Sequence, residues 1–191
     1  DKVAALLSVL GPVEGKRCLD LGSDNGVVSL LLRKQGGSWA SGDLTPETVE
    51  AIRGLVGTDV HLVTEDRLPF ADGEFDVVVV ADMLEHVERE AAFVAELARV
   101  LKPGGRLVVN TPHARNTALR RLRLSLGQTD DKHGHLRPGY TRESLGALLR
   151  ASFEIGETAT YTKAFSETVD AVMQFGLERV GKKGSKKGVV V

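Results

Sequence analysis

The sequence predicts an α/β protein with a Rossmann-like, doubly wound and mostly parallel sheet that has helices on both faces. From residue 2 to about residue 110, short apolar stretches alternate with stretches of helical spacing, as in successive right-handed βαβ units. One stretch, 75–81 (FDVVVVA), is mostly apolar and β-branched, as expected of a central parallel strand covered on both faces. The 191 residues suffice for one such domain with a full core.

Helix and strand signals alternate through the first part of the chain. Apolar residues at helical spacing predict a helix over 2–10, which a Gly-Pro pair ends. A second helix is expected from the glycine-rich turn to about residue 35. Thr45 and Pro46 open a third, because threonine caps a helix start and proline fits its first turn. Short apolar runs predict strands over 18–21, 39–43 and 60–64.

The next part contains the strongest strand and a long insertion. After the strand over 75–81, helical spacing predicts a helix over 89–101, ended by a Lys-Pro-Gly-Gly sequence. A fifth strand is expected over 106–110. Residues 112–140 are longer than an ordinary connection, so we predict a helical lid insertion with a short helix over 117–126.

The C-terminal part begins with a helix to about residue 151, capped by Thr141 and supported by Glu143. We expect one domain over 1–164 and a separate C-terminal segment over 165–191. Three further elements complete the prediction: a sixth strand over 153–161, an amphipathic helix over 165–180 and a flexible basic tail over 181–188.

Composition argues against several classes of function. The formal net charge of −1 argues against a general nucleic-acid binder. Cys18 is the single cysteine, which excludes an internal disulfide, and it lies where a buried strand is expected. The five histidines have no zinc-site spacing, so we expect no metal site. The sequence contains no signal-peptide pattern and no apolar run near 18 residues, so we expect a cytoplasmic protein.

The stretch 18–32 (CLDLGSDNGVVSLLL) has the layout of a nucleotide-binding junction of strand, turn and helix. Gly22 and Gly26 allow the backbone to pass close to a ligand. Free N–H groups at the following helix start attract polar or anionic ligand groups. We expect Asp20, near the strand end, to point its carboxylate into the same cleft.

Acidic residues recur at the carboxyl ends of the predicted strands, where open parallel sheets bind ligands. Asp20, Asp43 and Asp82 lie at strand ends, and Asp66 follows the third strand. Any one of them is explained by a turn or a helix cap, but together they favour a binding cleft. Asp43 ends the second strand, where a carboxylate can accept hydrogen bonds from both hydroxyls of a ribose, so we interpret it as a nucleoside-binding residue.

A dinucleotide-binding fingerprint would require glycines at positions 22, 24 and 27. The chain has Gly22, Asp24 and Val27 at these positions. A nicotinamide-linked oxidoreductase is therefore disfavoured.

Several motifs in order resemble a known family: DLGSDNG, the acidic strand end at Asp43, the EDRLPF loop, FDVVVVADMLEHV and LARVLKPGGRLVV. Together they are similar to class I S-adenosylmethionine-dependent methyltransferases of the small-molecule, quinone-biosynthesis-like type (methyltransferase type 11). The resemblance extends over residues 16–153, most of the chain. It implies S-adenosylmethionine as methyl donor and S-adenosylhomocysteine as product.

The resemblance also implies roles for the residues of the first turn. Gly22 and Gly26, with Ser23 and Asp24 between them, would approach the methionine half of the cofactor, and Asp20 would lie near its amino group. Asp24 departs from the family, which usually has glycine there. Aspartate tolerates unusual backbone angles, but its carboxylate near the cofactor's own carboxylate would weaken binding.

Further positions are implied for the nucleoside and the donor methyl group. Asp43 would hold the ribose and Leu44 would pack on the adenine. Asp66 would accept from the adenine amino group, with Arg67 beside it. Asp82 would line the donor methyl side of the site.

Methyl transfer from a sulfonium is an in-line displacement, so alignment dominates and a base is optional. His86 follows the fourth strand in LEHV, which in similar proteins faces the active site, and packing is its alternative role. His113 follows the fifth strand and is a second candidate base. In the lid, His133 and His135 with Tyr140 either close over the substrate or brace the loop.

The insertion is basic and includes a predicted amphipathic helix. Leu119, Leu122 and Leu126 share one helix face, so the opposite face can lie on anionic lipid or pair with a phosphate or carboxylate. A solvated helix docked by its leucines is the alternative. Its basic residues, against Asp130 and Asp131, are Arg115, Arg120, Arg121, Arg123, Lys132, Arg137 and Arg142.

We therefore expect an S-adenosylmethionine-dependent methyltransferase that acts on a small or lipid-like acceptor, at oxygen or carbon. An anionic acceptor and peripheral contact with an anionic membrane are further hypotheses. The alternative of a different class is an inactive adenosyl-cofactor-binding module, for which Asp24 is the only sequence support. The nicotinamide-linked oxidoreductase ranks third.

Overall fold

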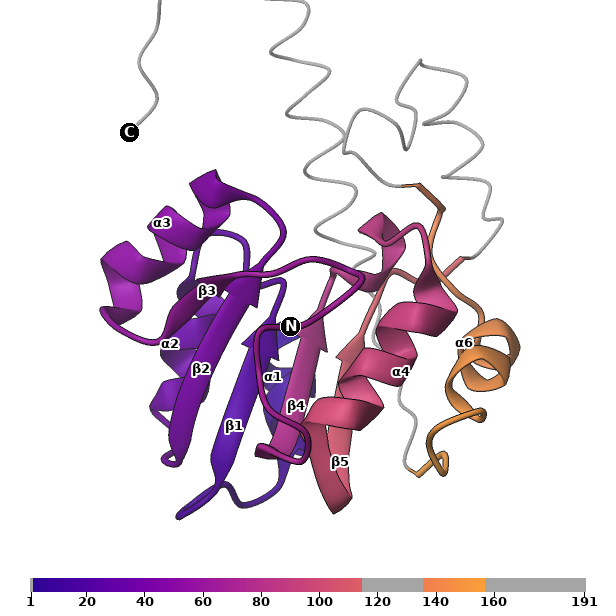
Figure 1. Ribbon diagram of the computed structural model, residues 1–191, viewed down its shortest axis with the longest axis horizontal. Helices are drawn as coiled ribbons and strands as arrows, with labels where there is room; N and C mark the ends of the chain where they lie inside the picture. Colours follow the sequence, from indigo (N-terminus) through magenta and orange to yellow (C-terminus); the bar gives the residue numbers. More distant parts are fainter. Residues whose placement is uncertain (1, 115–135, 157–191) are drawn as a thin grey trace, which may run out of the picture. The chain divides into compact units, whose positions relative to one another are not determined.

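A computed structural model describes residues 2–114 and 136–156 of the chain (Figure 1). Strands and helices alternate in it, as expected of βαβ units. The elements in chain order are α1 (Lys2–Leu10), β1 (Arg17–Leu21), α2 (Val27–Arg33), β2 (Ser38–Asp43), α3 (Pro46–Val56), β3 (Val60–Leu62), β4 (Phe75–Ala81), the 3₁₀ helix η1 (Leu84–His86), α4 (Glu90–Val100), β5 (Leu101–Asn110) and α6 (Arg142–Leu149).

The described strands form one parallel five-stranded sheet in the order β3-β2-β1-β4-β5. The chain builds outward from β1 to β3, returns to the other side of β1 with β4, and continues outward to β5. The strand order therefore reverses between β1 and β4, which confirms the predicted doubly wound sheet.

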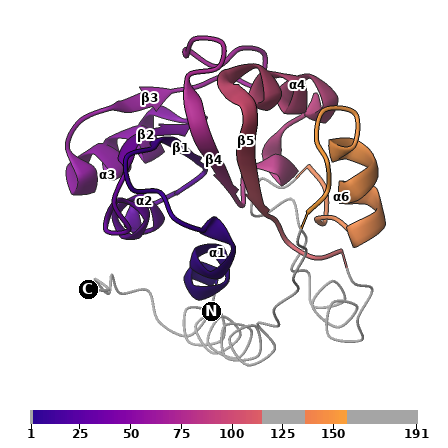
Figure 2. The same ribbon diagram turned by 90° about the horizontal axis from the view of Figure 1, so that it is seen from below.

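Alternate residues of the central strands enter two different cores. In β4, Val78 and Val80 pack in the cluster that includes Phe93 and Leu97 of α4. Val77 and Val79 instead join the cluster on the face of α1 and α2. Figure 2 shows α1, α2 and α3 on one face of the sheet and α4 and α6 on the other. Burial on both faces explains why β4 is apolar at nearly every position.

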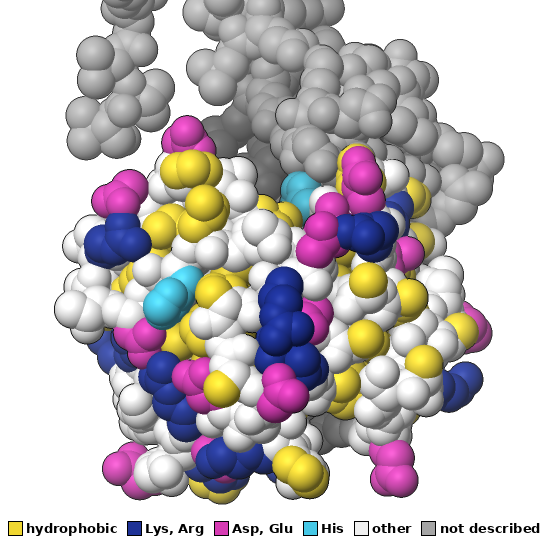
Figure 3. Space-filling view, in the orientation of Figure 1, with side chains coloured by type: hydrophobic (Ala, Val, Ile, Leu, Met, Phe, Trp, Pro, Cys, Tyr) yellow, Lys and Arg dark blue, Asp and Glu magenta, His cyan; other side chains and the backbone are white. Residues whose placement is uncertain are grey.

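Charged side chains of both signs are interspersed on the face drawn in Figure 3. Ion pairs join parts of the chain that are distant in sequence. Arg17 lies 2.7 Å from Asp59, and Lys102 lies 2.8 Å from Asp76. Within residues 2–114 and 136–156, no helix has both the length and the apolar character needed to cross a membrane.

The start of β5 differs from the prediction. The strand begins at Leu101, where the sequence predicts the end of a helix, and α4 ends one residue earlier. Leu101 pairs with Phe75, but the next partners are Arg106 and Val77, so residues 102–105 bulge out of the ladder. The proline and the two glycines that suggest a helix stop lie in this bulge.

The C-terminal elements agree with the prediction only in part. Thr141 caps α6 as predicted, and its reciprocal capping partner is Ser144. Residues 153–156 form no strand, so the predicted sixth strand does not begin at Phe153. The rest of that strand, the lid helix, the amphipathic helix and the basic tail lie outside the described residues. The domain boundary after residue 164 stays a prediction.

Candidate functional site

The carboxyl ends of β1, β2, β4 and β5 lie at one edge of the sheet because all these strands are parallel. The reversal of strand order between β1 and β4 places the turn after β1 beside the end of β4. This is the position at which doubly wound sheets bind ligands. The edge gathers the glycine turn, Asp43, Asp82 and the η1 turn.

The turn after β1 has its shape because two glycines take positive φ angles. Gly22 has φ 81°, and a Cβ there would lie 2.4 Å from the carbonyl oxygen of Ala81 in β4. Gly26 has φ 82°, and its Cβ would lie 2.8 Å from Cα of Ile52 in α3. Both glycines are therefore required by close packing of the protein itself, which fixes the turn against β4 and α3.

Asp24 also lies in the left-handed region, with φ 49°, and its side chain is exposed. Aspartate accepts this conformation at a lower cost than most residues, while glycine would accept it freely. The positive φ angle therefore explains why glycine is usual at this position in the family that the sequence resembles.

The prediction that Asp20 points a carboxylate into the cleft is wrong. The residue is completely buried, and its Oδ2 accepts hydrogen bonds from Ser23 Oγ at 2.6 Å and Ser29 Oγ at 2.5 Å. Its Oδ1 accepts from Ser41 Oγ at 2.8 Å and from Arg33 Nη1 at 3.3 Å. Asp20 thus joins the turn, α2 and β2 from within. Ser23, also predicted as a cofactor-binding residue, uses its hydroxyl in this network.

Asp43 presents a carboxylate at the end of β2. The residue is 8% exposed, and its Oδ1 accepts a hydrogen bond from the backbone N–H of Leu44 at 2.8 Å. Among the described residues, Oδ2 has no hydrogen-bond partner. A fixed carboxylate with one uncommitted oxygen fits a ligand that carries hydroxyl donors. Leu44 is half-buried beside it, against the core under α4.

Asp66 and Arg67 lie in the loop after β3, and both are exposed. Asp66 forms an ion pair with Arg89, at the start of α4. Two α4 residues hold the same loop more firmly. Glu96 accepts from the N–H of Leu68 at 3.0 Å.

Arg99 completes this anchor. Its guanidinium donates to the carbonyls of Leu68 at 3.0 Å and Phe70 at 2.9 Å. It also forms an ion pair with Glu96 at 2.7 Å. The loop therefore has a fixed backbone, although its predicted ligand-contacting side chains are exposed.

Asp82 follows β4 and has φ 48°. Its Oδ1 accepts from Asn110 Nδ2 at 2.6 Å, and its N–H donates to the Asn110 carbonyl at 2.9 Å. The ends of β4 and β5 are thus joined beside the crossover. Its role toward a donor methyl group stays a prediction.

Glu85 is a feature of this edge that the sequence did not single out as a binding residue. Its side chain is fully buried in η1, and Oε1 has no hydrogen-bond partner among the described residues. Oε2 is 3.5 Å from Thr111 Oγ1. Burial is the main cause that raises the pKa of this carboxyl, and the negative charge of Asp82 acts in the same direction. Only the three-dimensional structure shows that this acidic residue of a polar turn is enclosed.

The predicted catalytic residues have different environments. His86 is half-buried at the end of η1, and His113 is exposed after β5. Tyr140 is 7% exposed, and its hydroxyl donates to the Leu84 carbonyl at 3.1 Å. Burial and the Glu90 carboxylate raise the pKa of Tyr140 far above its usual value. It is therefore enclosed rather than open to a substrate, which favours the predicted bracing role over a catalytic one. His135 lies outside the described residues.

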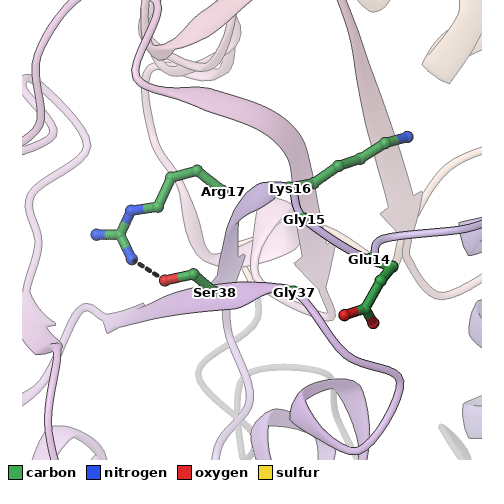
Figure 4. A pocket seen from close by; sticks show the side chains of 6 residues that line it. All are labelled: Glu14, Gly15, Lys16, Arg17, Gly37 and Ser38. Atoms are coloured by element: carbon green, nitrogen blue, oxygen red, sulfur yellow. Dashed lines mark hydrogen bonds between the residues drawn. The ribbon is translucent and has the colours of Figure 1, made fainter.

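A shallow hollow lies at the opposite, amino-terminal edge of β1 and β2. Figure 4 shows its lining residues: Glu14, Gly15, Lys16, Arg17, Gly37 and Ser38. Arg17 points toward Ser38 and already forms ion pairs with Asp59 and Glu74. The hollow is remote from the crossover and contains none of the predicted site residues.

A family of known proteins matches the part of the chain that forms the parallel sheet. Residues 19–109 match the family described as "Methyltransferase domain". This range runs from β1 to β5 and includes the turn, Asp43, the loop after β3 and η1.

Curated relatives match over about half of the chain. A protein of Xylella fastidiosa named ubiquinone biosynthesis O-methyltransferase is 40% identical over 106 residues, which are 52% of this chain and 43% of that protein. A demethylmenaquinone methyltransferase of Tropheryma whipplei is 32% identical over 108 residues, 55% of this chain and 45% of its own. The chain thus spans less than half the length of these relatives.

Solved structures show the same fold at low sequence identity. The YcgJ protein of Bacillus subtilis has a TM-score of 0.67 and 21% identity, over 93% of this chain and 80% of its own. A SAM-dependent methyltransferase from Aquifex aeolicus has a TM-score of 0.60 and 21% identity, over 81% of each chain.

Proposed function

The chain belongs to the class I S-adenosylmethionine-dependent methyltransferases, and from this premise we propose that it transfers the methyl group of S-adenosylmethionine to a small, lipid-like acceptor. The observation that most supports the proposal is the arrangement at the crossover. A tight turn after β1 and the carboxylate of Asp43 at the end of β2 lie at the same edge of the sheet.

Asp43 is the residue that fits the cofactor most directly. Its Oδ1 is fixed by the Leu44 N–H, and its Oδ2 is available to the two hydroxyls of a ribose. Leu44 would pack on the adenine, and the loop with Asp66 and Arg67 would border it. The turn between Gly22 and Gly26 would receive the methionine half through its backbone.

The bound cofactor supplies an electrophilic methyl group on a sulfonium. The protein's own contribution is to align the acceptor with that group and to exclude water. Alignment of this kind is worth up to about 7–11 kcal/mol of the barrier. When the acceptor atom is a hydroxyl oxygen, His86 would take up its proton, a role worth about 10²–10⁴ in rate.

The acceptor class rests on the relatives. Their names refer to ubiquinone biosynthesis and to demethylmenaquinone. We therefore propose a quinone-like aromatic acceptor that partitions into lipid, methylated at oxygen or carbon. We further propose a cytoplasmic location.

Turnover tests the proposal. The protein is incubated with S-adenosylmethionine labelled in the methyl group and with cell extract, and the aqueous and lipid phases are separated. We expect label in the lipid phase, and less of it with His86→Ala. Glu50→Gln, on an exposed part of α3, serves as the control and should label as the wild type does. Label in neither phase would contradict methyl transfer, and label only in the aqueous phase would contradict a lipid-like acceptor.

The basic residues of the insertion and of the tail support a second part of the proposal, contact with an anionic lipid surface. Flotation of the full-length protein with vesicles is the test. Binding should require vesicles that contain anionic phosphatidylserine and be absent with phosphatidylcholine alone. Equal flotation with both kinds of vesicle would contradict the proposed contact with anionic lipid.

A further inference from the structure

We propose that Arg137 and Tyr140 are positioning residues, which hold the turn of residues 84–87 so that His86 faces the acceptor side of the site. The inference rests on the proposed function, because these side chains matter to chemistry only if an acceptor binds beside them. Arg137 and Tyr140 are about fifty residues from the turn in sequence, and both donate hydrogen bonds to its backbone carbonyls.

The Leu84 carbonyl of this turn accepts from the N–H of Val87 at 3.3 Å, and donors outside the turn reach it and two further carbonyls. A 3₁₀ helix of three residues satisfies few of its own carbonyl groups. Arg137 Nη1 donates to the carbonyls of Leu84 at 3.0 Å and Val87 at 2.6 Å. The N–H of Leu136 donates to the Glu85 carbonyl at 3.1 Å. Residues on both sides of His86 are thereby fixed by one short segment.

Tyr140 reinforces the same contact. Its hydroxyl lies 3.1 Å from the Leu84 carbonyl and also hydrogen-bonds Glu90, at the start of α4. Arg137 Nε lies 3.5 Å from the same carboxylate. The Arg137 side chain is 22% exposed and that of Glu90 28%, so water screens this pair less than it screens a surface ion pair. Arg137 is therefore directed inward, toward the turn and Glu90.

The strand end that carries His113 is tied to the same segment. Tyr140 accepts from the N–H of Ala114 at 3.0 Å and donates its own N–H to the Pro112 carbonyl at 2.9 Å. His113 and Tyr140 form a parallel bridge. Gly139 has φ 105°, and a Cβ there would lie 2.1 Å from the Pro112 carbonyl oxygen. Residues 112–114 and 136–140 thus meet beside η1.

This arrangement predicts a specific defect. Loss of the guanidinium fork or of the phenol releases the carbonyls of the turn, and the imidazole of His86 shifts relative to the acceptor. Displacement of a reacting group by about 1 Å can cost about 10²-fold in rate. Cofactor affinity should stay the same, because Asp43 and the glycine turn belong to other strands.

The test uses Arg137→Met and Tyr140→Phe in the full chain, with Arg150→Met as the matched control. Arg150 is exposed at the end of α6. Methyl transfer is measured with the lipid fraction of cell extract, and S-adenosylhomocysteine affinity is measured by calorimetry. We expect transfer to fall about 10–100-fold in both variants, affinity to stay within about twofold, and Arg150→Met to match the wild type.

An NMR measurement separates positioning from a general loss of stability. In folded, histidine-labelled protein, the ring resonance of His86 should move in both variants, while that of His61, in β3, stays in place. The inference would be overturned if the variants transferred methyl groups as the wild type does and the His86 ring resonance did not move. It would also be overturned if methyl transfer and cofactor affinity were lost together. If the wild type transfers no methyl group but His86 moves, the positioning contact stands and the proposed function fails.

Discussion

Glu85 and Asp24 are the two residues of the site with an unfavourable side-chain environment or backbone conformation. The carboxyl of Glu85 is buried, and among the described residues its Oε1 has no hydrogen-bond partner. The backbone of Asp24 has a positive φ angle, in the left-handed region. Such positions cost stability and are retained where the surrounding structure fixes them. Each of them leads to a prediction about a single substitution.

The pH dependence of stability should change in Glu85→Gln. Burial raises the pKa of Glu85 above its usual value of 4.5, so the folded protein binds this proton more tightly than the unfolded chain. Below pH 4.5 the carboxyl is protonated in both states and adds no pH-dependent cost, and it destabilises the fold as the pH rises through its folded pKa. The stability of Glu85→Gln relative to the wild type should rise from pH 4 to pH 8, by about 1.4 kcal/mol per unit of pKa elevation.

Urea unfolding across this pH range measures the effect. Glu154→Gln is the matched control, because Glu154 is exposed in the described C-terminal part. Its curve should run parallel to that of the wild type. A parallel curve for Glu85→Gln as well would show that the buried carboxyl does not titrate differently in the folded state.

Asp24→Gly should bind S-adenosylhomocysteine equally or more tightly. Glycine takes the φ of 49° without strain and removes a carboxylate from the proposed position of the cofactor's own carboxylate. Its stability should stay within about 1 kcal/mol, because relief of strain offsets the greater freedom of the unfolded chain. Clearly weaker binding, measured by calorimetry, would show that the carboxylate has a favourable role, for example toward the methionine amino group.

Individual site residues could be predicted from the sequence when their position depended on local strand and turn signals. The glycine turn and the end of β2 could be located because strand and turn signals are local. Asp20 was misassigned because its partners Ser29 and Ser41 come from α2 and β2. The two predicted roles of Tyr140 could not be separated for the same reason, since its partners lie in η1 and α4.

The loop after β3 depends on α4, which is the clearest coupling between elements in the described fold. Arg99 donates to two loop carbonyls, and Glu96 accepts a loop N–H. These contacts hold the backbone of the segment that carries Asp66 and Arg67. A change on α4 should therefore reach the adenine side of the site.

Arg99→Lys tests this coupling. Lysine keeps the charge but cannot reproduce the planar fork, so we expect stability to fall by about 1–3 kcal/mol and cofactor affinity to fall with it. Arg106→Lys is the control, because Arg106 also donates to a distant carbonyl, that of Leu10, but on α1. Thermal unfolding and calorimetry measure both quantities. Unchanged affinity for S-adenosylhomocysteine in Arg99→Lys would contradict the expected coupling between α4 and the site.

Element boundaries were predictable where one signal dominated. The strand Phe75–Ala81 was predicted to the residue, because a strand buried on both faces is continuously apolar. The start of β5 was not, because its pairing runs through a bulge that contains Pro103 and two glycines. In a single sequence, such a bulge has the same composition as a helix stop.

The whole molecule brings these parts together through its topology. The reversal of strand order between β1 and β4 sets the glycine turn against the end of β4 and leaves Asp43 on one side and η1 on the other. This arrangement supports the proposal of a nucleoside side on β2 and an acceptor side on β4 and β5. Sequence reasoning predicts the nucleoside side from Asp43 at the end of the second strand, whereas the donor methyl side at Asp82 is implied by the family resemblance.

Calorimetric titration with S-adenosylhomocysteine tests the central claim most directly, with NAD as the competing ligand class and Asp43→Asn as the site variant. We expect binding of S-adenosylhomocysteine by the wild type and by Glu50→Gln, and no binding of NAD. Asp43→Asn should bind about 10–100-fold more weakly, because hydrogen bonds to a charged group are worth about 1.5–3 kcal/mol. Absence of S-adenosylhomocysteine and S-adenosylmethionine binding by the wild type at millimolar concentration would contradict the account.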